Sequence, residues 1–196
     1  NKKKYIAIES DSQLILPDNF FKRLFKNLYL SIIFKNKYIL GFSGGNYSHK
    51  KLFSNYGMNK ERINLMPMMV NNSRFFNDFK SFPETFTFLY VGRLVEIKNV
   101  ENLIIEFNRH FTNRKALLKI VGSGTNEKYL KDRYSSSKIL FLGSLFSDEL
   151  TAQYHSASCF VIPSIFEPWG LVINEALSSG LPVISLENIG ANQDLI

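Results

Sequence analysis

Short apolar runs alternate with longer segments of helical periodicity between residues 85 and 196. Apolar runs of about four to six residues are typical of strands buried on both faces, and apolar residues spaced three or four apart are typical of helices that cover a sheet. This alternation predicts an α/β domain with a parallel, doubly wound sheet. The expected strands are 86–91, 117–121, 139–142, 159–162 and 182–185, and the expected helices are 100–111, 126–133, 148–155 and 170–179.

The beginning of the chain carries a shorter version of the same pattern. A helix is expected after Pro17 and Asp18, which form a start signal, and a second helix is expected to stop at Gly57. Residues 70–84 are polar and irregular apart from Phe75 and Phe76, which predicts a linker. The expected strands here are 5–8, 38–42 and 62–66, and the expected helices are 19–34 and 47–56.

Composition places the chain among ordinary globular proteins. Of its 196 residues, 45% are hydrophobic and 21% are charged, which argues against a disordered or fibrous chain. The longest apolar runs, such as Leu28 to Phe34, are too short for a membrane-spanning helix, which needs about 20 residues. A cleavable signal is not expected. The lone Cys159 permits no internal disulfide, so a reducing cytoplasm fits best.

The positive charge is confined to one part of the chain. Residues 1–60 contain 11 Lys and Arg against 3 Asp and Glu, whereas residues 61–196 contain 13 against 14. Basic stretches interleaved with Phe, such as residues 20–26, attract anionic lipid headgroups, nucleic acid or other polyanions. A solvated lysine-rich face explains the charge equally well, and no nucleic-acid-binding signature accompanies it.

Ligands of doubly wound sheets bind where the loops leave the carboxyl ends of the strands. One such loop follows Val91 and contains Gly92, at which backbone can approach a ligand closely, with Arg93 and Lys98 as two cations. A guanidinium and an ammonium group can hold a diphosphate between them. Taken alone, the same pair is also consistent with a solvated surface loop.

A second loop brings two carboxylates near a predicted helix start. Glu167 lies in the loop and Glu175 lies in the helix that opens near Gly170. The backbone N–H groups of Gly170 and Leu171 would accept an anion there, and a carboxylate can accept hydrogen bonds from sugar hydroxyls. For Glu175 alone, an ordinary exposed helix position is the simpler interpretation.

Other candidate groups have weaker support. His49, His110 and His155 fall on separate expected helices and do not form a ligand cluster. Ser43-Gly44-Gly45 lacks the Lys-Ser/Thr of a phosphate loop, so a tight turn is expected. Glu9 and Asp11 follow the first expected strand and are candidate acceptor-side carboxylates, with a solvated loop as the alternative.

Together these motifs resemble glycosyltransferase family 4, whose members are retaining nucleotide-sugar transferases with the GT-B architecture of two facing Rossmann-like domains. The resemblance is specific over residues 85–196 and weaker over residues 18–76, where residues 57–63 and Phe76 are similar to the exit from the family's first domain. The motifs that carry it are Val91-Gly92-Arg93 with Lys98, Val121-Gly122-Ser123-Gly124, Leu142-Gly143, Pro163-Ser164 with Glu167 and Glu175, Gly180-Leu181-Pro182-Val183 and Gly190-Ala191.

The resemblance implies a role for each site residue. Arg93 and Lys98 match the cations that hold the donor diphosphate, Glu167 matches the glutamate that faces the transferred sugar, and Glu175 matches the glutamate that binds the nucleotide ribose. The catalytic set is then Arg93, Lys98 and Glu167, with no metal and no cofactor. The donor-binding set is Gly92, Gly122, Leu145 (where the base is expected), Phe166, Gly170, Leu171 and Glu175.

The resemblance also implies a domain organisation. It predicts a partial N-terminal acceptor-side domain over residues 1–72, a linker over 73–84, and a nucleotide-sugar donor-binding domain over 85–196 that lacks its last helices. A complete family member is nearly twice as long, so the chain is expected to be a fragment. The chain departs from the family pattern at three places: Met68-Met69-Val70-Asn71 replaces Asn-Gly-Val-Asp, Gly190-Ala191 replaces Gly-Gly, and Asp194 stands where a Glu is expected.

The expected activity is transfer of a sugar from a UDP- or GDP-sugar to a glycan or lipid-linked acceptor, with retention, in cell-surface polysaccharide biosynthesis. The alternative is a sugar-nucleotide-binding module or inactive remnant without transferase activity. The basic N-terminal third predicts contact with an anionic membrane surface, so the protein is expected in the cytoplasm, peripheral at the inner face of the plasma membrane. No nucleic-acid partner is expected.

Overall fold

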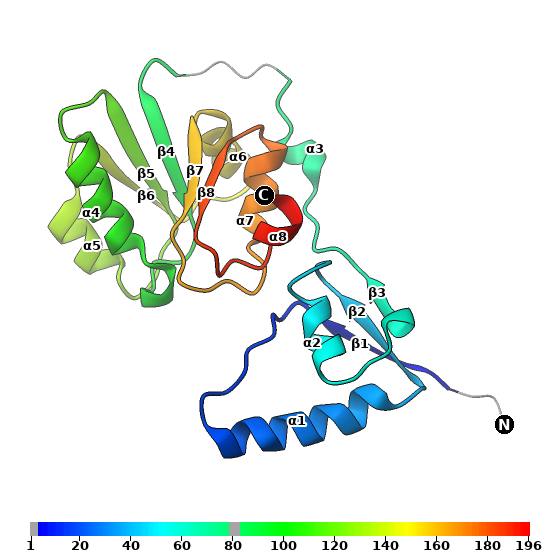
Figure 1. Ribbon diagram of the computed structural model, residues 1–196. Helices are drawn as coiled ribbons and strands as arrows, with labels where there is room; N and C mark the ends of the chain where they lie inside the picture. The colour runs from blue at the N-terminus through cyan, green and yellow to red at the C-terminus, as the bar shows by residue number, and fades with distance from the viewer. Residues whose placement is uncertain (1–3, 79–82) are drawn as a thin grey trace. The chain divides into compact units, whose positions relative to one another are not determined.

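A computed structural model describes residues 4–78 and 83–196 of the chain. The chain divides into two compact units: the first comprises the residues up to Met69 together with Gly190–Ile196, and the second comprises Val70–Ile189. Each unit is built on its own parallel sheet (Figure 1). Residues 1–3, which include most of the Lys2-Lys3-Lys4 run, and residues 79–82 of the expected linker lie outside the described part.

Unit 1 is a three-stranded parallel sheet with two helices. The strands β1 (Ile6–Ser10), β2 (Ile39–Ser43) and β3 (Ile63–Leu65) lie in the order β1-β2-β3. The helices are α1 (Phe20–Lys35) and α2 (Lys50–Asn55), a 3-10 turn η1 (Lys60–Arg62) precedes β3, and α8 (Asn192–Leu195) belongs to this unit as well. Its core contains Phe34, Ile39, Phe53, Tyr56 and Met58.

Two expectations for unit 1 need correction. The first strand continues to Ser10 because Glu9 and Ser10 pair with Phe42 and Ser43 of β2, so Glu9 lies within the strand and does not follow it. The second helix was expected to begin at Tyr47, but it begins at Lys50 because the preceding residues form a turn.

The end of α1 is held by an arginine from η1. The guanidinium of Arg62 donates hydrogen bonds to the carbonyl oxygens of Phe34 (3.0 Å), Asn36 (2.5 Å) and Ile39 (2.9 Å). These are carbonyls at the helix terminus and the start of β2, which a cation stabilises. Because only Phe34 of α1 is buried, this helix is attached to unit 1 through its last turns.

Unit 2 is a five-stranded parallel sheet covered by helices, which confirms the predicted α/β class. Its strand order is β6-β5-β4-β7-β8, so the chain moves outward from β4 in one direction and then in the other. The strands are β4 (Phe86–Val91), β5 (Ala116–Val121), β6 (Ile139–Gly143), β7 (Cys159–Ile162) and β8 (Val183–Ser185). The helices are α3 (Asn72–Phe75), α4 (Val100–Phe111), α5 (Glu127–Tyr134), α6 (Ser147–His155) and α7 (Leu171–Ser178), with a 3-10 turn η2 (Glu96–Lys98) before α4.

This strand order places a topological switch point between β4 and β7. The loops that follow these two neighbouring strands diverge, and ligands of open α/β sheets bind at such a point. The loop after β4 contains Arg93 and Lys98, and the loop after β7 contains Glu167. The fold therefore brings the predicted catalytic residues to one edge of the sheet.

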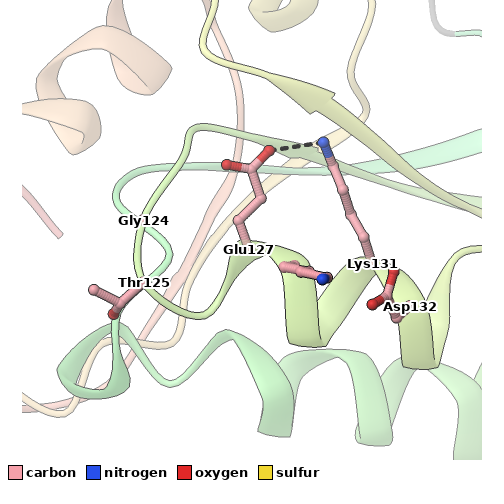
Figure 2. Close-up of a pocket in the computed structure, with 6 residues that line it drawn as sticks. Gly124, Thr125, Glu127, Lys131 and Asp132 are labelled. Atoms are coloured by element: carbon pink, nitrogen blue, oxygen red, sulfur yellow. Dashed lines mark hydrogen bonds and ion pairs between the residues drawn. The ribbon is translucent and has the colours of Figure 1, made fainter.

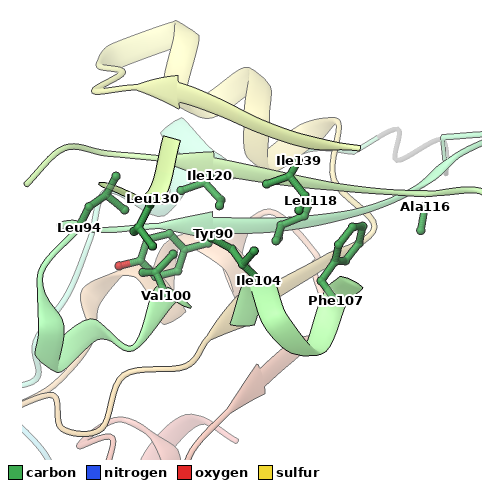
Figure 3. Packing of buried hydrophobic residues seen from close by; sticks show 10 residues of the cluster. All are labelled: Tyr90, Leu94, Val100, Ile104, Phe107, Ala116, Leu118, Ile120, Leu130 and Ile139. Carbon is green, nitrogen blue, oxygen red and sulfur yellow. The ribbon is translucent and has the colours of Figure 1, made fainter. Parts of the chain in front are cut away.

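The hydrophobic core of unit 2 supports the strands and the helix that these loops connect. Tyr90 of β4 and Leu118 and Ile120 of β5 pack against Ile104 and Phe107 of α4 (Figure 3). Aromatic rings of α4 and β4 extend this packing, since the Phe88 and Phe107 rings meet edge to face at 6.0 Å. None of the described helices combines the length and apolarity needed to cross a membrane.

The helix α3 is a feature that the sequence pattern did not predict. It lies where the irregular segment was interpreted as a linker, but Phe75 is only 4% exposed and its ring meets Tyr154 of α6 edge to face at 5.5 Å. Ser178 of α7 donates a hydrogen bond to Asn72 (3.0 Å). The start of unit 2 is thus packed onto α6 and α7.

Candidate active site

The loops after β4 and β7 are joined by an ion pair between two predicted catalytic residues. The Lys98 ammonium group of η2 contacts the Glu167 carboxylate, and each side chain is only 13% exposed. The Ser164 hydroxyl donates a second hydrogen bond to the same carboxylate oxygen (3.1 Å). A largely buried charge is stable only when it is paired and hydrogen-bonded, so these three residues form one hydrogen-bonded group.

Backbone contacts hold the two loops in place around this pair. The amide of Ile165 donates to the carbonyl of Ile97 (2.9 Å), and the Asn99 carboxamide donates to the carbonyl of Pro163 (3.1 Å). Asn99 adopts a left-handed conformation with φ of 58°, which Asn tolerates better than most residues. Lys98 and Glu167 are therefore positioned by the backbone on both sides.

Tyr90 lies within electrostatic reach of both Arg93 and Glu167. Its hydroxyl donates to the carbonyl of Arg93 (3.0 Å), whereas the Arg93 side chain itself is exposed. Burial raises the pKa of Tyr90 well above its usual range, the Glu167 carboxylate raises this pKa further, and the Arg93 guanidinium lowers it. The hydroxyl therefore stays protonated and fixes the start of the Arg93 loop.

The loops after β4, β5 and β6 are bonded to one another through their glycines. The amide of Gly92 donates to the carbonyl of Val121 (3.0 Å), and the amide of Gly122 donates to the carbonyl of Gly143 (2.7 Å). Gly122 has a φ of 128°, and a Cβ atom there would lie 1.9 Å from the carbonyl oxygen of Gly92. This close approach explains why glycine stands at position 122. Leu145, half-buried, follows in the β6 loop.

A pocket lies beside this group of loops, along α5. It has a volume of about 370 Å³ and is lined by residues of the β5 loop, Gly124 and Thr125, and by polar side chains of α5 (Figure 2). Lys131 and Glu127 form an ion pair of 2.7 Å on its wall. None of the predicted site residues lines this pocket.

The amino end of α7 has the geometry expected for anion binding. Gly170, with φ of 98°, precedes the helix, which begins at Leu171. Within the part of the chain that the structure describes, no hydrogen bond is found for the backbone N–H groups of these two residues. Both amides are available to a ligand, and the helix dipole favours a negative one. The half-buried Phe166 lies in the loop that leads to them.

Glu175 has a different environment from Glu167. It lies on α7 and accepts a hydrogen bond from the hydroxyl of Tyr154 (2.6 Å). Burial raises the pKa of the Glu175 carboxyl, while the hydrogen bond from Tyr154 and the charge of Arg74 lower it. Each of the two glutamates is thus held by its own partners.

The remaining candidate residues contact neighbouring parts of the chain. His49 is buried next to the Gly44 turn, His110 lies 3.4 Å from Glu106, and His155 hydrogen-bonds the carbonyl of Phe75 (2.9 Å). Asp194 accepts hydrogen bonds from the backbone N–H groups of Asn46 and Tyr47, at 3.1 and 3.2 Å. In residues 4–78 and 83–196, no group of three or more His, Cys, Asp or Glu side chains has the arrangement of a metal site.

The structure thus brings Lys98 and Glu167 together and places Arg93 near them. Sequence reasoning missed the residues that hold this group, namely Ser164, Tyr90 and Asn99, and it missed Tyr154 beside Glu175. Ser164 had a signal, because a hydroxyl directly after a buried strand lies at the ligand edge of the sheet. Tyr90 and Tyr154 had none, because both occupy apolar positions of a strand and a helix.

Comparison with known proteins places this site in a family. The family model "Glycosyl transferases group 1" matches residues 71–196. The chain belongs to this family. A glycosyltransferase of Methanocaldococcus jannaschii, described as uncharacterized, is 38% identical over 112 residues, which make up 55% of this chain and 28% of the relative. Glycogen synthase of Mycobacterium tuberculosis is 39% identical over 107 residues, 52% of this chain and 26% of the relative.

The fold of this group 1 family member is also shared with solved structures. Anabaena HepE in complex with UDP matches 96% of the chain with a TM-score of 0.74 and 17% identity, and the match covers 55% of HepE. The predicted GT-B fold class is confirmed. The chain spans about a quarter of the length of the curated relatives that it matches and about half of this solved structure.

Proposed function

We propose that the chain supplies the donor site of a retaining, metal-independent glycosyltransferase of family 4. The enzyme would move a sugar from a UDP- or GDP-sugar to a glycan or lipid-linked acceptor, in cell-surface polysaccharide synthesis. The observation that carries the proposal is the Lys98–Glu167–Ser164 group at the β4/β7 switch point, with the amino end of α7 in the same loop. Solved neighbours that bind UDP, and UDP with glucose, support a nucleotide-sugar donor.

The proposed chemistry requires positive charge where the sugar leaves the diphosphate. As the bond between the anomeric carbon and the β-phosphate oxygen breaks, negative charge builds on the phosphate. Lys98, Arg93 and the amides of Gly170 and Leu171 would stabilise that charge, which is an electrostatic contribution made mainly in the transition state. The new bond forms from the acceptor hydroxyl to the anomeric carbon, and Glu167 would face the transferred sugar.

A donor panel tests the proposal directly. The protein is incubated with UDP- and GDP-sugars, with and without EDTA, and donor hydrolysis, transfer and the anomeric configuration of the product are followed by NMR. We expect turnover of one donor class, retention of configuration and no loss on chelation. Binding of a nucleoside diphosphate without hydrolysis or transfer would favour the alternative, a sugar-nucleotide-binding module.

Substitution of the two glutamates is expected to affect nucleotide binding and sugar transfer differently. Glu175→Ala should weaken nucleoside diphosphate binding about tenfold, because a carboxylate that accepts ribose hydroxyls contributes on the order of 1.5 kcal/mol. Glu167→Ala should leave nucleotide affinity nearly unchanged and impair transfer, because Glu167 would face the transferred sugar and not the nucleotide. Calorimetric titration with UDP or GDP, together with initial rates, measures both effects. Equal losses of nucleotide affinity in the two variants would contradict this division.

We also propose that α1 contacts an anionic membrane surface. Seven of its large apolar side chains are more than half exposed, and the helix contains Lys22, Arg23, Lys26 and Lys35 but no acidic residue. Apolar side chains interleaved with cations suit a headgroup region, where each cation contributes about 1 kcal/mol. The exposed apolar side chains are Phe20, Phe21, Leu24, Phe25, Leu28, Tyr29 and Ile32.

Sedimentation with liposomes measures this contact. We expect binding to phosphatidylglycerol vesicles at low salt, release at high salt and no binding to phosphatidylcholine vesicles. Changing Lys22, Arg23 and Lys26 to Gln should lower the partition coefficient about a hundredfold, from roughly 3 kcal/mol of lost attraction. The matched control changes Arg114, Lys115 and Lys128, which are exposed cations of unit 2, to Gln. These substitutions remove the same amount of positive charge. Equal losses in both triple variants would show a general charge effect.

A further inference from the structure

The hydroxyl of Tyr154 is held against the carboxylate of Glu175 by the packing of the tyrosine ring. Tyr154 lies on α6 and its side chain has no exposed surface. Its ring is held between Phe75 (centroids 5.5 Å apart) and Phe160 (5.7 Å apart). From there the hydroxyl donates to Oε2 of Glu175 at 2.6 Å, a short, charge-assisted distance. A buried ring in this packing has little freedom to rotate away from the carboxylate.

The second carboxylate oxygen is not engaged in the same way. In the described part of the chain, Oε1 of Glu175 has no hydrogen-bond partner, and the residue is half-buried. Tyr154 therefore uses one oxygen and leaves the other for a ligand. A carboxylate anchored through one oxygen presents the other in a defined direction, which reduces the entropy lost when a ligand hydroxyl binds.

The packing behind Tyr154 comes from the first helix of unit 2. Phe75 of α3 is buried against the tyrosine ring, and His155, the next residue of α6, bonds the Phe75 carbonyl (2.9 Å). Arg74, also on α3, contributes positive charge toward Glu175. Among the described residues, the charged and titratable groups that act on Glu175 are Tyr154 from α6 and Arg74 from α3.

We infer that Tyr154 is a positioning residue for the nucleotide, holding Glu175 in the orientation in which its second oxygen accepts the ribose hydroxyls. The inference rests on the ribose role proposed for Glu175. The segment around Phe75, first interpreted as a linker, then has a function in the site, because it closes the packing that fixes Tyr154.

The hydrogen bond also has an expected pH signature. Ribose binding favours the ionised carboxylate, because that form only accepts hydrogen bonds, whereas the protonated carboxyl has an O–H donor on one oxygen. Burial raises the pKa of Glu175, and the Tyr154 hydroxyl opposes this rise by donating to the charged form. Removing the hydroxyl therefore raises the pKa of Glu175 further. Nucleotide binding, which weakens as the pH falls through this pKa, should be lost at a higher pH.

Tyr154→Phe tests the inference, because the variant keeps the ring and its packing. Binding of UDP and GDP is titrated between pH 4 and 8, with inorganic pyrophosphate as a ligand that lacks the ribose. We expect about fivefold to tenfold weaker nucleotide binding at neutral pH, an acid limb displaced to higher pH, and unchanged pyrophosphate binding. Tyr134→Phe is the matched control. It removes a partly buried tyrosine hydroxyl that donates a hydrogen bond to Glu101 (2.8 Å), and it should change the binding of neither ligand.

A double-mutant comparison separates the possible failures. In a Glu175→Ala background, Tyr154→Phe should have no additional effect on nucleotide affinity. If Glu175→Ala alone leaves the affinity unchanged, the ribose role is wrong and the inference falls with it. If Glu175→Ala weakens binding but Tyr154→Phe does not, the inference alone is wrong. If Tyr154→Phe weakens nucleotide and pyrophosphate binding equally, the tyrosine has only a structural role.

Discussion

Replacing Arg93 by alanine is expected to lower kcat about a hundredfold, with a much smaller change in donor affinity. The charge on the leaving diphosphate is greatest in the transition state, so a cation that faces it contributes more to turnover than to ground-state binding. Arg93 suits this test because its side chain is exposed and forms no ion pair with any described residue. Its removal leaves no carboxylate without a partner, so the free energy of unfolding should change by less than about 0.5 kcal/mol.

Lys98→Ala provides an informative contrast. It removes the partner of Glu167, whose side chain is only 13% exposed, and should therefore lower both turnover and stability. Lys98→Ala combined with Glu167→Gln should recover part of the stability but none of the turnover. Steady-state kinetics and urea unfolding measure the two quantities for each variant.

Arg114→Ala is the control for long-range attraction of the donor, because this exposed arginine precedes β5 at the opposite edge of the sheet. It should leave kcat unchanged. If Arg93→Ala retained near-normal turnover, or if both arginine variants lost the same factor, Arg93 would not hold the diphosphate. Loss of donor affinity without loss of kcat would place Arg93 in ground-state binding only.

The strands and the longer helices of unit 2 were predictable because each is determined locally. The strand at 86–91 and the helix at 100–111 have the predicted bounds, since a run buried on both faces and an apolar stripe are complete within one segment. The glycines after the strands were predictable as loop markers. Only the structure shows the reason for Gly122, which is the carbonyl oxygen of Gly92 in another loop.

The rest depended on contacts between distant segments. Lys98 and Glu167 are separated by 69 positions, so no local spacing indicates that they pair. The helix α3 has only four residues and no periodicity, and it is stabilised by Phe75 packing on Tyr154. The extension of β1 to Ser10 is set by its pairing with β2. In each case tertiary contacts determined what local sequence left open.

Gly122→Ala is expected to have the largest effect on stability. A Cβ atom at this position would lie 1.9 Å from the carbonyl oxygen of Gly92, and φ of 128° is unfavourable for any residue with a side chain. The backbone must move to relieve the overlap, and this movement breaks the hydrogen bond from Gly122 to Gly143 (2.7 Å). We expect a loss of about 4 kcal/mol or more in the free energy of unfolding of unit 2.

Gly143→Ala separates steric overlap from backbone strain. Gly143 also has a positive φ, of 70°, but a Cβ atom there would meet no other atom within 4 Å. Only the left-handed conformation is then penalised, at about 1–2 kcal/mol. Trp169, the single tryptophan, lies buried in unit 2, so its fluorescence during urea unfolding reports both variants. If the two substitutions destabilise unit 2 equally, the β4 and β5 loops do not approach each other through Gly92 and Gly122. If Gly122→Ala alone is severe and also abolishes nucleotide binding, that close approach supports both the fold and the donor site.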